Sequence, residues 1–511
     1  MKQRRLGAVA LAAAIPLLLT ACFFGGGGDA TSTPTGESVD AALEPYYTQT
    51  IRWKDCENGF QCATVIAPMD WANPSPETDI ELAVVRQPAT GTSQGALFVN
   101  PGGPGASGYD FVRDSIDFAV SEQLQANFDV VGWDPRGVGR STPVTCYGDA
   151  QLDEFIFGIP AAPIGTQEWI DEVTQASIDF GQACLQNTGE VLQFIDTQST
   201  VRDLDMLRAI VGDEKLNYLG YSYGSDIGSY YVENFPEKVG RLVVDGATDS
   251  SISVFEVSRT QTAGFQRALE NYLRACPDLF DDCPFTGTVE TGLAVIRGLY
   301  DRYDANPVAG PDGRMMDAGV LDIAMSMALY SQDSWSFLND LFSEADQGIT
   351  DTAFFLADYY YSRNEDGTYA DNSLEAFLAI YCVDYPVETD PTVLAEQEAL
   401  LQQASPTTYR NLPPIGDTTC ANWPYKYIGP DIQALTGAGA PPVLVVSTTG
   451  DPATPYEWGV ALSEQLQSAQ LITFNGEGHT AYPQGNECIV STVDDYFING
   501  TVPTEDPNCG A

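Results

Sequence analysis

The sequence is very poor in histidine, because its 511 residues contain only one, His479. Metal sites that need several histidines, such as the HExxH site of zinc proteases, are therefore excluded. Basic residues are also scarce, with 23 Lys and Arg against 71 Asp and Glu and a formal net charge of -48. A protein without a basic surface lacks the electrostatic footprint of a nucleic-acid-binding protein. We therefore expect no nucleic-acid partner, and we expect the charge to favour solubility outside the cell and attraction of cationic ligands.

Several cofactor motifs are missing as well. The glycine-rich residues 102–108 lack the lysine of a P-loop. No CxxC pair is present, so a structural zinc site is the weaker explanation of the cysteines. We expect an enzyme that works without a metal or an organic cofactor.

The N-terminus has the pattern of an export signal. Lys2, Arg4 and Arg5 precede an apolar run, residues 6–19, that is too short for a confident membrane span. The run ends in Leu-Thr-Ala-Cys22, which resembles a bacterial lipobox. We predict a lipoprotein signal peptide at residues 1–21, lipidation of Cys22, and anchoring to the outer face of the bacterial cytoplasmic membrane. An ordinary signal peptide with a chance cysteine is the alternative. The Gly/Ser/Thr/Pro-rich residues 22–40 are predicted to be a flexible tether.

Ten cysteines remain once Cys22 is assigned to the lipid, and an even number in an exported chain indicates five disulfides. Spacing does not determine their connectivity. Short separations favour Cys56–Cys62 and Cys276–Cys283. Pairing the others as neighbours in order suggests three more bonds: Cys146–Cys184, Cys382–Cys420 and Cys488–Cys509.

Short apolar runs alternate with helical patterns along much of the chain. Strands are predicted at residues 80–85, 96–99, 128–133, 216–219 and 241–244, and again at 442–447 and 471–474. A helix capped by Ser199 or Thr200 and a final helix at 487–498 belong to this pattern. Residues between the two groups of strands are mostly helical. We predict a mostly parallel central sheet (core, residues 41–249 and 437–511) with a helical cap at 250–436, inserted between the sixth and seventh strands.

The strongest chemical motif is Gly220-Tyr221-Ser222-Tyr223-Gly224. It follows a predicted strand and precedes a predicted helix, which is the context of the nucleophile elbow in the α/β-hydrolase fold. A serine hydroxyl is a weak nucleophile until a base removes its proton. Ser222 is therefore the predicted nucleophile, and the fold class is predicted to be α/β-hydrolase.

The base must be His479, since no other histidine exists. It lies in a glycine-rich loop just after the last predicted strand. The third member of a catalytic triad is an acid that holds the imidazole in the correct tautomer. It is predicted to be Asp451, after the strand at 442–447. Asp245, at the end of the strand at 241–244, is the rival.

An oxyanion hole needs two backbone N–H groups aimed at the developing negative charge. One is expected from Tyr223, the residue after the nucleophile. The other is expected from the loop at 100–105, with Gly103 as first choice and Gly102 as second, because glycine lets the backbone face a substrate. Arg136, in the motif at residues 134–141, is predicted to be structural and to brace the active-site loops.

Seven stretches resemble the secreted tripeptidyl aminopeptidases and related members of the prolyl-aminopeptidase-like hydrolase family. They are residues 51–56, 100–105, 133–141, 220–224, 244–246, 379–384 and 450–457. The last lies in a region that resembles the TAP-like C-terminal domain of that group. Prolyl aminopeptidases have a histidine before the Gly-Gly-Pro-Gly run. Pro101 stands there in this sequence, as is usual in the tripeptidyl branch.

The resemblance implies removal of short peptides, often tripeptides, from substrates with a free N-terminus. Such a reaction needs a carboxylate to hold the substrate ammonium, and Asp384, Glu457 and the loop at Glu365 and Asp366 are the candidates. The same machinery serves the alternative, a carboxylesterase or acyl hydrolase of the cell envelope. A third hypothesis is a non-catalytic binding protein with a hydrolase fold. No obligate protein partner is evident.

Overall fold

The computed structural model describes residues 30–56, 58–410, 413–429, 433–483 and 486–510. The predicted signal peptide and the predicted lipidation site, Cys22, lie outside these ranges. None of the helices within them has the length and hydropathy needed to cross a membrane.

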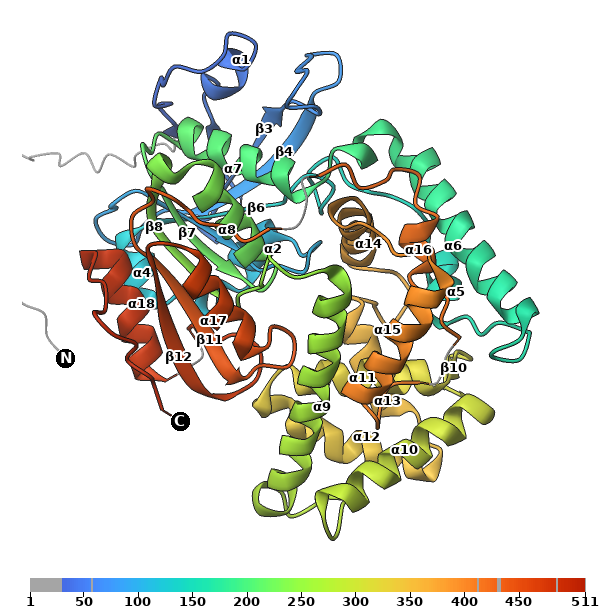
Figure 1. Cartoon of the computed structure of the whole chain (residues 1–511). Helices are drawn as coiled ribbons and strands as arrows, with labels where there is room; N and C mark the ends of the chain where they lie inside the picture. Colours follow the sequence, from blue (N-terminus) through green and yellow to red (C-terminus); the bar gives the residue numbers. More distant parts are fainter. Residues whose placement is uncertain (1–29, 57, 411–412, 430–432, 484–485, 511) are drawn as a thin grey trace, which may run out of the picture.

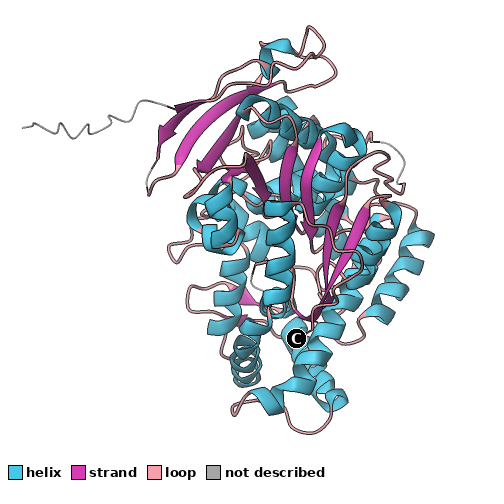
Figure 2. Ribbon diagram, turned by 90° about the vertical axis from the view of Figure 1, so that its left-hand side faces the viewer, coloured by secondary structure: helices cyan, strands magenta, loops and turns pink. Residues whose placement is uncertain are grey.

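A ten-stranded sheet forms the centre of the core, with the order β1-β2-β3-β4-β6-β5-β7-β8-β11-β12. From β6 to β12 all neighbours are parallel, and the strands before β6 in this order pair antiparallel. The strands are β1 (Ala30–Thr31), β2 (Arg52–Asp55), β3 (Gln61–Ala67), β4 (Ile80–Gln87), β5 (Ala96–Asn100), β6 (Asp129–Trp133), β7 (Leu216–Tyr221), β8 (Val239–Asp245), β11 (Val443–Gly450) and β12 (Ala469–Glu477). Figure 2 shows the sheet as a twisted band with helices on both sides.

Both faces of the sheet are buried, which explains the continuous apolar runs of the sequence. Along β5, for example, Phe98 packs on one face while Leu97 and Val99 pack on the other. The first face is covered by α7 (Thr197–Val211), α8 (Gly224–Asn234) and α17 (Tyr456–Gln465). The second is covered by α2 (Gly108–Asp114), α4 (Glu122–Asn127) and α18 (Glu487–Asn499). The short helices α1 (Glu44–Tyr47) and α3 (Ile116–Ala119) complete the core.

A helical cap lies beside the core, at the lower right of Figure 1. It has a hydrophobic core of its own, built mainly from α9 to α13. Its helices between β8 and β11 are α9 (Val254–Leu279), α10 (Val289–Ala305), α11 (Ala318–Leu329), α12 (Trp335–Gln347), α13 (Asp351–Tyr360), α14 (Ser373–Asp384), α15 (Pro391–Ala404) and α16 (Thr418–Ala421). A two-stranded ribbon, β9 (Val308–Ala309) with β10 (Met315–Met316), lies among them. Counted from β3, the cap follows the sixth strand and precedes the seventh.

Two helices from an earlier part of the chain contact the cap as well as the core. α5 (Asp149–Phe157) and α6 (Gln167–Thr188) belong to the segment that the sequence analysis assigned to the core. Yet Asp153 of α5 forms an ion pair with Arg363, at 2.7 Å, and the Ser177 hydroxyl of α6 lies 2.9 Å from that of Thr418. These long-range contacts carry no local sequence signal.

The helix assigned to a Ser199 or Thr200 cap begins earlier. α7 starts at Thr197, and the Asp196 side chain caps it by accepting a hydrogen bond from the Ser199 backbone N–H. Aspartate is as good an N-cap as serine, so composition does not separate the two positions.

The prediction of a flexible tether is wrong for its described part, residues 30–40. Ala30 and Thr31 pair with β2 as an edge strand, and the Thr35 N–H donates to the carbonyl of Ala209. Glu37 accepts from buried Arg208 at 2.8 Å and also pairs with Lys238. Arg208 of α7 and Lys238, which directly precedes β8, therefore fix a segment whose composition is typical of a linker.

Five disulfides connect the chain, and they are the five pairs that spacing and order suggest: Cys56–Cys62, Cys146–Cys184, Cys276–Cys283, Cys382–Cys420 and Cys488–Cys509. The bond Cys146–Cys184 ties α6 to the segment after β6.

Candidate active site

The predicted catalytic residues follow the carboxyl ends of parallel strands, where ligands bind in open α/β sheets. Ser222 follows β7, Asp451 follows β11 and His479 lies beyond β12. Ser222 occupies the left-handed region with φ 53°, a conformation that non-glycine residues adopt only when their surroundings enforce it. Its N–H donates to the carbonyl of Asp245, the last residue of β8. The elbow is thus braced by the neighbouring strand.

His479 and Asp451 are joined by a hydrogen bond. The imidazole Nδ1 lies 2.9 and 3.0 Å from the two oxygens of the Asp451 carboxylate. Asp451 is 1% exposed and also accepts from the N–H groups of Ala453 and Thr454 and from the Thr454 hydroxyl. Burial opposes protonation of His479, but the adjacent Asp451 carboxylate outweighs it, and the pKa of the imidazole is raised above its usual value. This pair can hold a proton on Nδ1 and stabilise an imidazolium.

The rival acid, Asp245, has a different role. Its carboxylate accepts the N–H groups of Ala481 and Tyr482 at 2.7 to 3.1 Å, and no hydrogen bond to the imidazole is found for it among the described residues. Burial raises the pKa of Asp245 to about 7, although those two N–H groups oppose the shift. Asp245 therefore holds the loop after His479. Next to it, a Cβ at Gly246 would come within 3.1 Å of His479 Cε1, so the end of β8 contacts both the elbow and the imidazole.

The glycine loop after β5 packs on the elbow. A Cβ on Gly102 would lie 2.9 Å from Tyr223 N, so only glycine fits there. The Gly102 N–H is already used, because it donates to the Asn100 side chain at 2.9 Å. For the N–H groups of Gly103 and Tyr223 the described part of the protein offers no acceptor. The N–H of Gly102, the second choice for the oxyanion hole, is thus already hydrogen-bonded. The N–H of Gly103, the first choice, is available.

The cap contacts the histidine loop through Tyr330, which sequence reasoning missed. The His479 N–H donates to the Tyr330 carbonyl at 2.8 Å, and the Tyr330 ring meets the imidazole edge-on with 5.5 Å between centroids. Tyr330 directly follows α11, far from His479 in sequence, and no local pattern marks it. Cap packing therefore helps to orient the imidazole.

Asp384 lies close to the elbow, whereas the other predicted substrate carboxylates do not. Its oxygens accept the N–H and the hydroxyl of Thr197, at 2.9 and 2.6 Å, and the Thr197 hydroxyl also bonds the Tyr223 hydroxyl. Burial, with a contribution from Asp196, raises the pKa of Asp384 to about 8.

Glu457 is exposed at the start of α17 and faces Arg267 of α9 at 3.4 Å. Glu365 and Asp366 are exposed in a loop where Asp366 bonds Thr368. The structure brings neither group together with Ser222.

Arg136 is structural, as predicted, but it braces other segments. It is fully buried and forms a two-pronged pair with Asp203, at 2.6 and 2.7 Å, and it donates to the carbonyls of Pro68, Met69 and Phe194. In the described ranges no group of three or more His, Cys, Asp or Glu side chains is placed to hold a metal ion.

Comparisons with known proteins fit this geometry. Residues 95–281 match the family described as alpha/beta hydrolase fold, and residues 411–509 match the family described as TAP-like protein. The protein is 34% identical to the serine protease Hip1 of Mycobacterium tuberculosis over 521 aligned residues, covering 97% of this chain and 96% of the relative. The chain belongs to the α/β-hydrolase family. It is thus a serine hydrolase related to serine peptidases.

Two further relatives differ in their named activities. A tripeptidyl aminopeptidase of Streptomyces lividans is 32% identical, with 90% of this chain and 86% of the relative covered. A protein of Mycobacterium tuberculosis named carboxylesterase B is 38% identical, with 88% of this chain and 86% of the relative covered. Family membership therefore indicates a serine hydrolase, but it does not decide between peptide and ester substrates.

Proposed function

We propose that the protein is an exported serine exopeptidase that releases short peptides, chiefly tripeptides, from free N-termini. The observation that carries the proposal is the bond between His479 Nδ1 and buried Asp451 at the strand edge that also holds the Ser222 elbow. The relatives named serine protease and tripeptidyl aminopeptidase support peptide substrates.

In the proposed mechanism, the Ser222 hydroxyl attacks the scissile carbonyl while His479 Nε2 takes its proton. Asp451 keeps the other imidazole proton on Nδ1 and stabilises the imidazolium. The N–H groups of Gly103 and Tyr223 receive the oxyanion. His479 then protonates the leaving amine, an acyl-enzyme remains on Ser222, and water hydrolyses it with His479 again acting as base.

The free ammonium of the substrate requires a carboxylate near the acyl side of the cleft. Asp384 is the best of the named candidates, because Thr197 connects it to Tyr223. Glu457 is exposed and paired with Arg267, and the loop at Glu365 and Asp366 is exposed as well. A cation bound beside Asp384 favours its ionised form, so binding would couple to release of a proton.

Export and lipid anchoring at Cys22 form part of the same proposal. Five disulfides are typical of a protein that matures in an oxidising compartment, which supports export. Detergent-phase partition of the full chain, compared with a Cys22→Ala variant, tests the anchor. Equal partition of the two would refute it.

A second candidate function is ester hydrolysis with the same residues, and the relative named carboxylesterase B favours it. The test compares three substrates: a free-amine tripeptide p-nitroanilide, its N-acetylated twin and a medium-chain p-nitrophenyl ester. The proposal predicts fast turnover of the free peptide alone. Ester turnover without peptide cleavage would favour the second candidate. Ser222→Ala should abolish either activity while leaving the melting temperature unchanged.

A further inference from the structure

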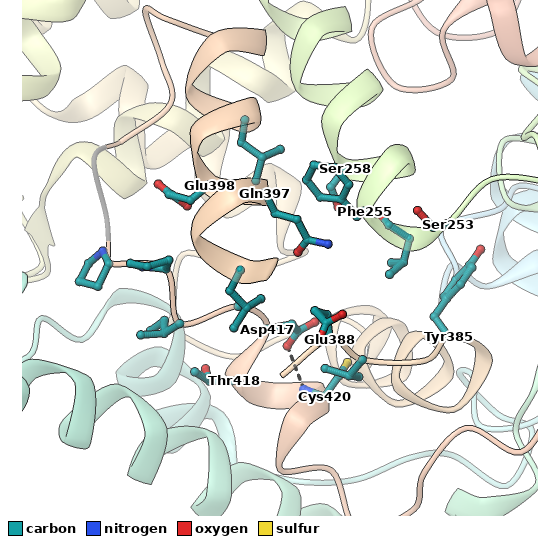
Figure 3. A pocket seen from close by; sticks show the side chains of 18 of the residues that line it. Ser253, Phe255, Ser258, Tyr385, Glu388, Gln397, Glu398, Asp417, Thr418 and Cys420 are labelled. Carbon is teal, nitrogen blue, oxygen red and sulfur yellow. Dashed lines mark hydrogen bonds between the residues drawn. The ribbon is translucent and has the colours of Figure 1, made fainter. Parts of the chain in front are cut away.

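A cavity of about 700 Å³ lies within the cap, between the start of α9, the end of α14, α15, α16 and α6. This volume is in the range of pockets that bind small organic ligands. Its walls are mainly apolar and aromatic. They include Trp169, Phe255, Tyr381, Tyr385, Leu394 and Leu401. Figure 3 shows α15 on one side of the cavity and the start of α9, with Ser253, Phe255 and Ser258, on the other.

Helix α15 packs against α9 and borders this cavity, but none of its side chains is fully buried. The cap helices α9 to α14 all have buried side chains, whereas α15 has none. Leu394, Gln397 and Leu401 lie on one helical face, at spacings of three and four residues, and all three line the cavity. The adjacent Leu400 points to solvent and is 43% exposed. The inner face of α15 therefore borders the cavity, whereas the inner faces of α9 to α14 contribute buried side chains.

An aromatic row connects the cavity to the proposed oxyanion loop. Phe377, Tyr381 and Tyr385 follow one another at intervals of four residues, with ring centroids 5.8 and 5.1 Å apart. Tyr381 and Tyr385 line the cavity. At the other end, a Cβ on Gly105 would come within 2.8 Å of Phe377 N, so α14 begins directly on the glycine loop. A chain bound along this row would extend from the elbow into the cavity.

The charges of the lining are of one sign. Glu388, Glu398 and Asp417 contribute carboxylates to the wall, and no Lys, Arg or His is found among the described residues that line it. Asp384 lies beside Tyr385 on the side of the elbow. An occupant with apolar groups and a positive charge fits such a wall, whereas an anion is repelled.

We propose that the cap cavity binds the apolar side chains of the N-terminal residues of the substrate peptide, with α15 as its lid. The inference rests on the proposed exopeptidase function and adds a substrate class: peptides whose first residues are bulky, apolar and free of acidic side chains. Stacking and apolar contact with the row from Phe377 to Tyr385 give this segment its direction. The occupant fills the volume beneath the inner face of α15.

The neighbouring leucines of α15 provide a matched test in the full chain. Leu401→Trp fills the cavity, whereas Leu400→Trp adds the same bulk on the solvent face. We expect Leu401→Trp to lower kcat/KM for a free-amine Leu-rich tripeptide p-nitroanilide at least about tenfold relative to tri-alanine p-nitroanilide. Leu400→Trp should keep the wild-type ratio. Hydrolysis of p-nitrophenyl acetate, which needs the proposed triad and oxyanion hole but not the cavity, should be equal in all three proteins.

Leu394→Trp, on the same inner face, repeats the test if Leu401→Trp does not fold. A wild-type ratio in whichever inner-face variant folds, with normal peptide turnover, overturns the cavity assignment and leaves the proposed function intact. Selective loss of p-nitrophenyl decanoate turnover, with the peptide ratio unchanged, identifies an acyl chain as occupant and also overturns it. If the wild-type protein hydrolyses esters and no peptide, the proposed function fails and this inference fails with it.

Discussion

Helices α7 and α15 have nearly the same length, 15 and 14 residues, but they are packed in opposite ways. Twelve side chains of α7 are buried, including the charged Asp203, Asp205 and Arg208, each with an ionic partner. In α15 none is buried. The difference separates two regions of the molecule. The side chains of the sheet side are closely packed around the proposed catalytic residues, whereas the cap side contains a cavity.

The largest expected effect concerns the sheet side. Asp451→Asn should lower kcat by about 10⁴-fold, because the amide no longer keeps the imidazole proton on Nδ1. Asp245→Asn should cost far less, since Asp245 accepts only backbone N–H groups near the site. Steady-state kinetics of both variants on one substrate measures the contrast. A larger loss in Asp245→Asn would reverse the assignment of the two carboxylates.

A second prediction compares the two helices by their stability. Leu204→Ala in α7 leaves a cavity in a packed core and should lower the free energy of unfolding by about 2–5 kcal/mol. Leu401→Ala in α15 removes a side chain that already borders empty volume, so its cost should stay below about 1 kcal/mol. Denaturant unfolding of both variants measures the two losses in free energy of unfolding. Equal costs would mean that α15 is packed as α7 is.

The smallest effect lies at the boundary of the two regions. Asp384 has a pKa of about 8 in the folded protein, against about 4 in an unfolded chain. The folded state keeps this proton where the unfolded state has lost it. Asp384 therefore makes stability fall as pH rises from about 4 to about 8. Asp384→Asn should flatten the melting temperature against pH in this window by a few degrees, and the same change at exposed Asp340 should not. An unchanged slope in Asp384→Asn would show that Asp384 ionises normally.

Much of the sheet side was predictable because its signals are local. The GxSxG motif follows its strand within a few residues, and a single histidine left one base to choose. The choice of the triad acid was ambiguous, because Asp451 and Asp245 both lie at the carboxyl ends of parallel strands. The hydrogen bond of His479 Nδ1 to Asp451 distinguishes the two. The five disulfide pairs are those that short spacing and chain order suggested, although the sequence did not determine them.

The features that sequence reasoning missed are long-range. Tyr330 contacts His479 from the cap. Glu37 is fixed by Arg208 and Lys238 although its surroundings have linker composition. α5 and α6, in the segment assigned to the core, also contact the segment between β8 and β11. The cap cavity has no motif, because it arises from the spaces between helices rather than from any run of residues.

The most direct test of the central claim is the identity of the first product. A ten-residue peptide with a free N-terminus and its N-acetylated twin would each be incubated with the full chain and analysed by mass spectrometry over time. Our account predicts release of the N-terminal tripeptide from the free peptide, with matching loss of three residues from the remainder, while the acetylated peptide stays intact. Internal cleavage of both peptides, or cleavage of neither by a protein that hydrolyses esters, would contradict it.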